Sequence, residues 1–211
     1  MQDLMSDKIN IDKNWEKLKF EFGSIKREGM DKFLEFLERK TDFKTAPAST
    51  KFHLNYKGGL VEHTLNVMRF ALELQKSLNI PDIKEESLKL TALLHDLCKI
   101  NYYTEGKEWD KEWKNQTNQW REIPVWKVDD EIPLGHGEKS VILAVRYLPL
   151  SVSEMTAIRW HMGFSDQGVH SFYPSGSPFR ESMDKYPLLK LLMLADAQAE
   201  LYESYSYAED S

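Results

Sequence analysis

The sequence of 211 residues contains a single cysteine, Cys98, so it offers neither an intrachain disulfide nor a cluster of thiolate zinc ligands. A chain without disulfides suits a reducing compartment. No apolar run approaches the roughly 18 residues that a membrane span requires, and residues 1–20 lack the apolar core of a signal peptide. These absences predict a soluble, cytoplasmic protein with no membrane partner.

Basic charge is also scarce. The chain has 28 Lys and Arg residues against 34 Asp and Glu residues, for a net charge of −6. Proteins that bind extended nucleic acid usually present a basic surface, because neutralised phosphates supply much of the affinity. We therefore do not expect an extended nucleic acid as partner. A small phosphorylated substrate stays compatible with this charge, since a bound metal ion brings its own positive charge.

The spacing of apolar residues predicts a chain that is nearly all helical. A capping box at Ser151 and Glu154 marks one helix start, and Pro187 suits the first turn of a last helix. Helices are expected, in chain order, over residues 15–25, 30–37, 59–74, 85–100, 136–148, 151–162 and from 187 onward.

Two segments interrupt the helical pattern. Residues 101–135 contain Trp109, Trp113, Trp120 and Trp126 around the polar stretch "KNQTNQ", which predicts a β-hairpin insertion with a central turn. The second, 163–181, is rich in Gly, Ser and Pro and is expected to be irregular. With no internal repeat or clear linker, the simplest organisation is one domain over residues 1–211. In it, residues 1–44 form N-terminal helices packed on the bundle.

Histidines and carboxylates stand inside the apolar segments. His95 and Asp96 end the run "LTALLHD", and Asp196 interrupts "LLKLLMLADAQAE". A buried carboxylate is costly unless it is paired or bound to a metal. Asp196 could pair with a buried Arg or Lys, and His63, on the helix after Gly59, could be a hydrogen-bonded core residue. Helices that converge in a bundle can instead direct these side chains to one metal site, with ligands suited to Zn, Fe, Mn, Ni or Co.

The order of these residues resembles the HD-domain superfamily of metal-dependent phosphohydrolases. The resemblance covers roughly residues 45–205, and "KFHLNYKGGLVEHTLNV" is similar to the start of the HD domain in certain bacterial 3′–5′ exoribonucleases. The motifs "LLHDLCKIN", "GHGEKS", "AIRWHMG" and "YPLLKLLMLAD" resemble small HD-domain proteins of Firmicutes and their prophages. The fold that this resemblance implies is all-α, an HD-domain helical bundle with a small β-hairpin insertion.

The resemblance also implies roles for single residues. The first metal ion would be held by His63, His95, Asp96 and Asp196, and a second by Asp96, His136 and His161, with Asp96 bridging the two. Lys99 matches a lysine that contacts phosphate, so Asp96 and Lys99 are the predicted catalytic residues. Substrate binding is predicted for His53, Lys99 and Arg159, although His53 could cap a turn and Arg159 could be a surface charge.

The function that follows is hydrolysis of a phosphoester, in a small and nucleotide-like substrate, by a metal-activated water at a site with two divalent transition-metal ions. One alternative is a one-metal HD nucleotidase or dNTP triphosphohydrolase, in which His136 and His161 would contact substrate. Another is a catalytically weak HD fold that serves as a ligand-binding module. Exoribonuclease activity fits the acidic balance poorly. A homodimer is compatible with the sequence.

Overall fold

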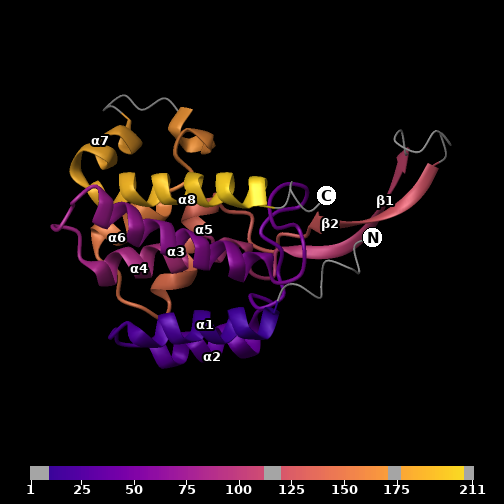
Figure 1. Ribbon diagram of the computed structural model, residues 1–211, viewed down its shortest axis with the longest axis horizontal. Helices are drawn as coiled ribbons and strands as arrows, with labels where there is room; N and C mark the ends of the chain where they lie inside the picture. The colour runs from indigo at the N-terminus through magenta and orange to yellow at the C-terminus, as the bar shows by residue number, and fades with distance from the viewer. Residues whose placement is uncertain (1–9, 112–119, 171–176, 207–211) are drawn as a thin grey trace.

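The computed structural model describes residues 10–111, 120–170 and 177–206. In these residues it has eight α-helices and a two-stranded antiparallel sheet (Figure 1), which confirms the predicted all-α bundle with a small hairpin. The α-helices are α1 (Ile11–Ser24), α2 (Met30–Lys40), α3 (Gly59–Ser77), α4 (Glu85–Leu94), α5 (His136–Val145), α6 (Val152–Trp160), α7 (Pro178–Lys185) and α8 (Pro187–Ser206). Three short 3₁₀ helices, η2 (Leu97–Lys99), η3 (Gly163–Ser165) and η4 (Gln167–His170), and the strands β1 (Tyr103–Lys111) and β2 (Trp120–Val128) complete the elements.

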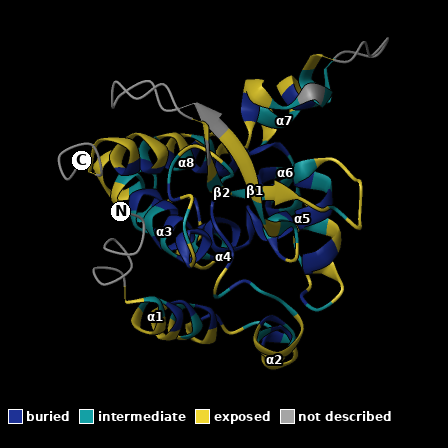
Figure 2. Cartoon of the chain, turned by 90° about the vertical axis from the view of Figure 1, so that its right-hand side faces the viewer, coloured by how far each residue is buried: buried dark blue, intermediate teal, exposed yellow. Residues whose placement is uncertain are grey.

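Helices α3, α4 and α8 form the centre of the bundle. Helix α8 lies along α3, and α3 also packs on α4, so α3 is covered on two sides (Figure 1). Leu60, Val67 and Ala71 of α3 are fully buried, as are Leu189 and Leu192 of α8. Helices α5 and α6 pack together beside this centre, and α6 also contacts α8 (Figure 2). The burial of apolar side chains therefore brings together the helices that carry the predicted ligands.

The predicted N-terminal helices form and pack on the bundle. Leu18 and Phe22 of α1 and Phe33 of α2 are completely buried, and they belong to the same apolar core as the side chains of α3 and α4. Figure 1 shows α1 and α2 side by side below the other helices. Their outward sides are exposed (Figure 2), as expected for amphipathic helices that cover a core.

The segment that precedes α2 is tied to α6 by an ion pair. The guanidinium of Arg27 donates to both carboxylate oxygens of Glu154 at 3.0 Å and to the carbonyl oxygen of Pro149 at 2.8 Å. Glu154 also completes the predicted capping box of α6, because its carboxylate accepts the Ser151 backbone N–H. Burial disfavours the Glu154 carboxylate, but the bonds from Arg27 outweigh it and hold the pKa of Glu154 below 4.5.

Replacing Arg27 with methionine is expected to lower the free energy of unfolding by about 3–5 kcal/mol, because it leaves the Glu154 carboxylate buried and unpaired. The depressed pKa of Glu154 gives stability above pH 4.5 that is lost as the pH falls through the lower folded value, so the difference between variant and wild type should shrink in acid. Urea unfolding at several pH values measures both effects. The control is Arg39→Met, which removes an exposed ion pair with Glu35 and should change stability by less than about 1 kcal/mol.

Several predicted helix limits are wrong. The helix expected over 85–100 ends at Leu94, just before His95. The helix expected to run to about Met162 ends at Trp160, within two residues of the prediction. Helix α5 likewise stops at Val145 rather than at residue 148. The segment 163–181 is less irregular than predicted, because it includes η3, η4 and the start of α7. Pro178 stands in the first turn of α7, where its fixed φ favours a helix start.

The insertion forms the predicted hairpin. Strands β1 and β2 pair antiparallel from Tyr103 opposite Val128 to Lys111 opposite Trp120. The indole N–H of Trp126 donates to the carbonyl oxygen of Asn55 at 3.0 Å, which fixes the base of the hairpin against the loop before α3. Farther along, the strands project away from the bundle (Figure 1). The predicted turn, together with Trp113, lies outside the described residues.

Candidate metal centre

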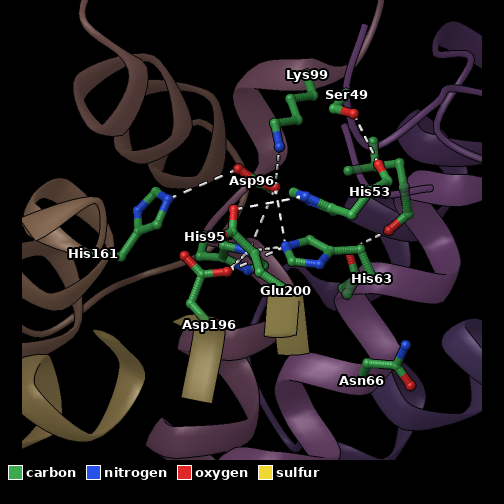
Figure 3. Close-up of polar contacts among 12 residues, drawn as sticks. Ser49, His53, His63, Asn66, His95, Asp96, Lys99, His161, Asp196 and Glu200 are labelled. Carbon is green, nitrogen blue, oxygen red and sulfur yellow. Dashed lines mark hydrogen bonds and ion pairs between the residues drawn. The ribbon is translucent and has the colours of Figure 1, made fainter. Parts of the chain in front are cut away.

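Five separate segments bring the six predicted metal ligands to one place. His63 comes from the second turn of α3 and Asp196 from the middle of α8. The others stand at helix ends: His95 and Asp96 after α4, His136 at the start of α5 and His161 after α6. These side chains converge on the carboxylate of Asp96, which is 3% exposed (Figure 3).

One group of ligands surrounds the Nε2 atom of His63. This atom lies 3.2 Å from Oδ1 of Asp196, 3.3 Å from Nε2 of His95 and 3.6 Å from Oδ2 of Asp96. Two nitrogen donors and two carboxylate oxygens thus face a common point from α3, α8 and the end of α4. This is the set that the resemblance assigned to the first ion, and the ligand atoms of three of its members, His63, His95 and Asp196, lie within 4.8 Å of one another.

A second group lies on the other side of Asp96. The Oδ1 atom of Asp96 is 2.7 Å from Nε2 of His136 and 3.8 Å from Nε2 of His161. Since Oδ2 of Asp96 faces His63 and His95 while Oδ1 faces His136 and His161, the two carboxylate oxygens point to different groups. The carboxylate of Asp96 therefore lies between the two groups of predicted ligands.

Two histidine rings are oriented by the same kind of local hydrogen bond. His95 and His161 each follow directly on the last residue of a helix, and the Nδ1–H of each donates to the carbonyl oxygen three residues earlier, Ala92 and Ile158, at 2.7 Å. A bond at Nδ1 leaves the lone pair of Nε2 free for a cation. Asp96, directly after His95, has φ −101° and ψ 19°, and this break in the helix turns its carboxylate toward α5.

The centre contains an unsatisfied nitrogen. Nε2 of His161 is buried and has no hydrogen-bond partner in the part of the chain that the structure describes. An unpaired polar atom in the interior costs on the order of 1–3 kcal/mol, so such atoms are rare without a reason. A metal ion beside Asp96 would satisfy it, and the donor set of imidazoles and carboxylates suits a divalent transition metal. The residues present therefore fit the ions that the sequence motifs implied.

The buried charges of the centre stabilise one another. Burial raises the pKa of Asp96, but the charges of Lys99 and His95 outweigh it and hold that pKa well below its usual value. Burial also opposes ionisation of Asp196, yet the hydrogen bond from His63 keeps the pKa of Asp196 far below normal. For His63, bonds to Asp196 and Glu203 outweigh burial and raise the pKa to about 10. Both carboxylates are thus ionised and ready to bind a cation.

Lys99 lies beside the predicted bridge. Its ammonium is 2.6 Å from Oδ2 of Asp96 and is 14% exposed, so it faces the centre while keeping an opening to solvent. Burial would lower the pKa of Lys99, but the Asp96 carboxylate raises it above normal, which keeps the side chain cationic. Lys99 reaches this position because η2 directly follows Asp96 and places the two residues one turn apart.

The two weaker candidates for substrate binding, His53 and Arg159, lie in different surroundings. The ring of His53 lies 4.9 Å from that of His63 at an angle of 40°. Burial lowers the pKa of His53 to about 4, so its ring is neutral near pH 7. The guanidinium of Arg159 instead pairs with Asp166 at 2.7 Å and with Glu138. Arg159 thus has partners away from the centre. Substrate contact by either residue stays a prediction.

Two residues of this region were missed from the sequence. Glu203 is 1% exposed and accepts hydrogen bonds from Nδ1 of His63 at 3.0 Å and from the amide of Asn66 at 2.9 Å. Glu200, one turn before it, lies 3.7 Å from His53. A signal was available, since Asp196, Glu200 and Glu203 have the i, i+4, i+7 spacing of a single helix face.

Two glycines allow the close packing that the centre needs. A Cβ atom at Gly59 would overlap the carbonyl oxygen of Leu54, and one at Gly137 would overlap that of Arg159. The first contact sets the loop of His53 against the start of α3. The second brings α5 against α6, next to His136 and His161. Larger residues would separate the helices that hold the ligands.

The comparisons with known proteins agree with this arrangement. The HD domain family model matches residues 60–200, more than half of the chain, so the chain belongs to the HD-domain family. A stretch of 61 residues is 39% identical to the dihydroneopterin 2′,3′-cyclic phosphate phosphodiesterase of Methanocaldococcus jannaschii, and it covers 28% of this chain and 24% of that enzyme. The match thus spans about a quarter of that relative's length. No solved structure matches the chain.

These findings confirm the family that the sequence motifs indicated. At the level of that family, they support metal-dependent phosphohydrolase chemistry. Within the described residues, no helix is both long enough and apolar enough to span a membrane.

Proposed function

We propose that this protein is a metal-dependent phosphohydrolase that cleaves a phosphoester at a centre with two divalent ions. The observation that supports this most is the convergence of four histidines and two carboxylates on a buried point, where His161 Nε2 has no hydrogen-bond partner among the described residues. We assign His63, His95, Asp96 and Asp196 to the first ion and Asp96, His136 and His161 to the second, as the sequence motifs imply. Among these residues, the ligand atoms of His63, His95 and Asp196 lie within 4.8 Å of one another, as do those of His95, Asp96 and His161. The donor set suits Fe, Mn, Ni, Co or Zn, and availability decides among them.

When bound, such ions supply Lewis acidity, and they lower the pKa of water toward neutrality. Residues of the chain would bind the phosphate, keep the carboxylates ionised and exclude water. Lys99 places a fixed positive charge 2.6 Å from the Asp96 carboxylate, where it can attract and orient a phosphate group. Asp96 and Asp196 stay ionised because their neighbours depress their pKa values. The burial of His95 and His161 excludes bulk water from the inner side of the centre.

We propose a small, nucleotide-like phosphoester as substrate. The relative from Methanocaldococcus jannaschii is named for a phosphodiesterase acting on dihydroneopterin 2′,3′-cyclic phosphate, a small phosphorylated heterocycle. The net charge of −6 disfavours a long nucleic acid but not a single phosphate beside Lys99. A hydrolysis screen tests both parts of the proposal. It would offer cyclic nucleotides, nucleoside mono-, di- and triphosphates, short oligonucleotides and p-nitrophenyl phosphates, with Mn²⁺ added.

We expect phosphate release from at least one nucleotide class, lost when a chelator is added and recovered with Mn²⁺. An enzyme preparation that keeps full activity after complete metal removal would contradict the metal-dependent mechanism. Activity on oligonucleotides alone would contradict the preference for small substrates.

The aromatic face of the hairpin gives a further prediction on substrate. Paired residues share one face, so Tyr103, Trp126, Trp109 and Trp120 all project to the same side of the strands. Tyr103 is nearest to the centre, and burial raises its pKa to about 12 against the opposing charge of Lys99. Trp109 is six residues farther along β1, or about 20 Å away at ~3.4 Å per residue, which exceeds the length of a mononucleotide.

We therefore expect that only the aromatics at the base of the hairpin stack on the base of a mononucleotide. Tyr103→Ala should raise KM for a nucleotide by roughly 5- to 100-fold, as for the loss of one stacking contact, and should leave turnover of p-nitrophenyl phosphate unchanged. The matched control is Trp109→Ala, a residue that is 66% exposed, which should change neither value. If Tyr103→Ala alters only the melting temperature, the hairpin does not bind substrate.

A further inference from the structure

The carboxylate of Glu203 is buried, and among the described residues no Lys or Arg side chain pairs with it. Its side chain is 0% exposed, near the end of α8. Its two hydrogen-bond donors are the Nδ1–H of His63, 3.0 and 3.2 Å from its two oxygens, and the amide of Asn66 at 2.9 Å. Removing a carboxylate from water is costly, so a glutamate at this position needs a use that an apolar residue would not serve.

The position of Glu203 follows from the same helix that carries a predicted ligand. Asp196 and Glu203 are seven residues apart on α8, so both face α3. Asp196 contacts the Nε2 side of the His63 ring at 3.2 Å, while Glu203 contacts its Nδ1 side. The imidazole is held between two carboxylates of one helix, and a rotation of the ring would break both contacts.

Asn66 fixes the Glu203 carboxylate in turn. It stands one turn after His63 on α3, so a single carboxylate binds two successive positions on the same helix face. The amide of Asn66 therefore orients the carboxylate of Glu203, and this carboxylate orients the ring of His63. His53 is farther away, with its Nε2 atom 4.0 Å from Glu203.

We propose that Glu203 is a positioning residue for the metal centre, and that it acts through His63 with Asn66 as its support. This inference rests on the proposed function, since it assigns His63 Nε2 to a cation. By accepting the Nδ1–H bond, Glu203 holds the proton on Nδ1 and leaves the Nε2 lone pair facing Asp196 and His95. The same bond makes Nε2 a stronger electron-pair donor to a cation. Loss of such a carboxylate typically weakens metal binding by about 10- to 100-fold.

Binding of Co²⁺ to metal-free protein, followed by its visible absorption, tests the inference without any substrate. Glu203→Ala should raise the Kd for Co²⁺ by about 10- to 100-fold. Glu203→Gln retains one acceptor oxygen and should recover part of that loss. Asn66→Ala should have a smaller effect, and Asn66→Ala combined with Glu203→Ala should bind no more weakly than Glu203→Ala alone, because Asn66 acts only through Glu203.

A control separates positioning from stability. Leu188→Ala removes a buried side chain at the far end of α8, and it should lower the melting temperature while leaving the Kd for Co²⁺ unchanged. If Glu203→Ala, or Glu203→Gln should the alanine variant not fold, binds Co²⁺ as tightly as wild type, the positioning role is wrong and the metal centre stands. If wild-type protein binds no Co²⁺, the proposed function itself is wrong, and the role of Glu203 falls with it.

Discussion

Asp96→Ala is expected to lose bound metal and hydrolytic activity together. Both carboxylate oxygens are engaged: Oδ1 lies 2.7 Å from His136, and Oδ2 lies within 3.6 Å of His63 and His95. The ligand atom of His95 also lies near both groups, but a single imidazole nitrogen binds one cation, so it cannot replace the carboxylate as a bridge. Loss of the charge stabilisation that the ions provide, several kcal/mol, corresponds to a decrease in kcat of about 1,000-fold or more.

The same substitution should also destabilise the metal-free protein. Asp96 is the ion-pair partner of Lys99 at 2.6 Å, and its removal leaves a largely buried ammonium without a counter-charge. The double variant Asp96→Ala/Lys99→Met removes both charges and should recover much of the melting temperature while staying inactive. Metal analysis and thermal unfolding of the three proteins separate the two effects. Asp96→Ala with normal metal content and turnover would show that Asp96 is not the bridge.

Residue type and order were enough to select side chains that the fold then brings together, because a charged or imidazole side chain inside an apolar helix is conspicuous. His95 and Asp96 end a fully apolar run, and Asp196 interrupts another. Burying such side chains costs free energy, and the sequence already indicates that they are buried. Each of them therefore needs a compensating partner. The helical bundle was predictable for the same reason, since the apolar spacing that buries α3 and α8 is local information.

The helix ends were not predictable in the same way. The spacing continues smoothly through "LTALLHDLCKI", yet α4 ends at Leu94, and the next turn is the 3₁₀ helix η2. The cause is a bond between the His95 ring and the Ala92 carbonyl, which competes with the helical pattern. The same competition occurs at His161 and Ile158. Such breaks arise from side-chain geometry, which periodicity does not contain.

Glu203 was missed for a different reason. It follows Asp196 in a stretch where polar residues become frequent, so its burial is invisible without the packing of α3 on α8. Arg159 is the opposite case. The resemblance suggested substrate binding for it, and in the structure its guanidinium is paired with Asp166 and Glu138. Contact with substrate stays a prediction. The spacing of residues along the chain shows which of them share a helix face. The pairing of charges depends on contacts between segments that are distant in the sequence.

The number of metal ions distinguishes the dinuclear mechanism from its one-metal alternative. His161 lies 3.8 Å from Oδ1 of Asp96, its Nε2 atom has no hydrogen-bond partner within the described ranges, and its ring is 5.3 Å from that of His136. If His136 and His161 hold a second ion, wild-type protein should approach two ions per chain, and His161→Ala should approach one. In the alternative, both proteins would bind a single ion, and the two histidines would contact substrate.

His161→Ala is therefore expected to lower kcat by about 1,000-fold, because the variant loses the charge stabilisation of one ion, while the first group around His63 keeps its metal. Elemental analysis of dialysed protein, paired with steady-state kinetics, measures both changes on the same sample. The matched control is His170→Ala, an exposed histidine whose ring contacts only the Phe164 carbonyl among its described polar contacts, and it should keep both the metal content and kcat of wild type. A His161→Ala protein that has the metal content of wild type and shows a raised KM with little change in kcat would favour the one-metal mechanism, with His161 as a substrate contact.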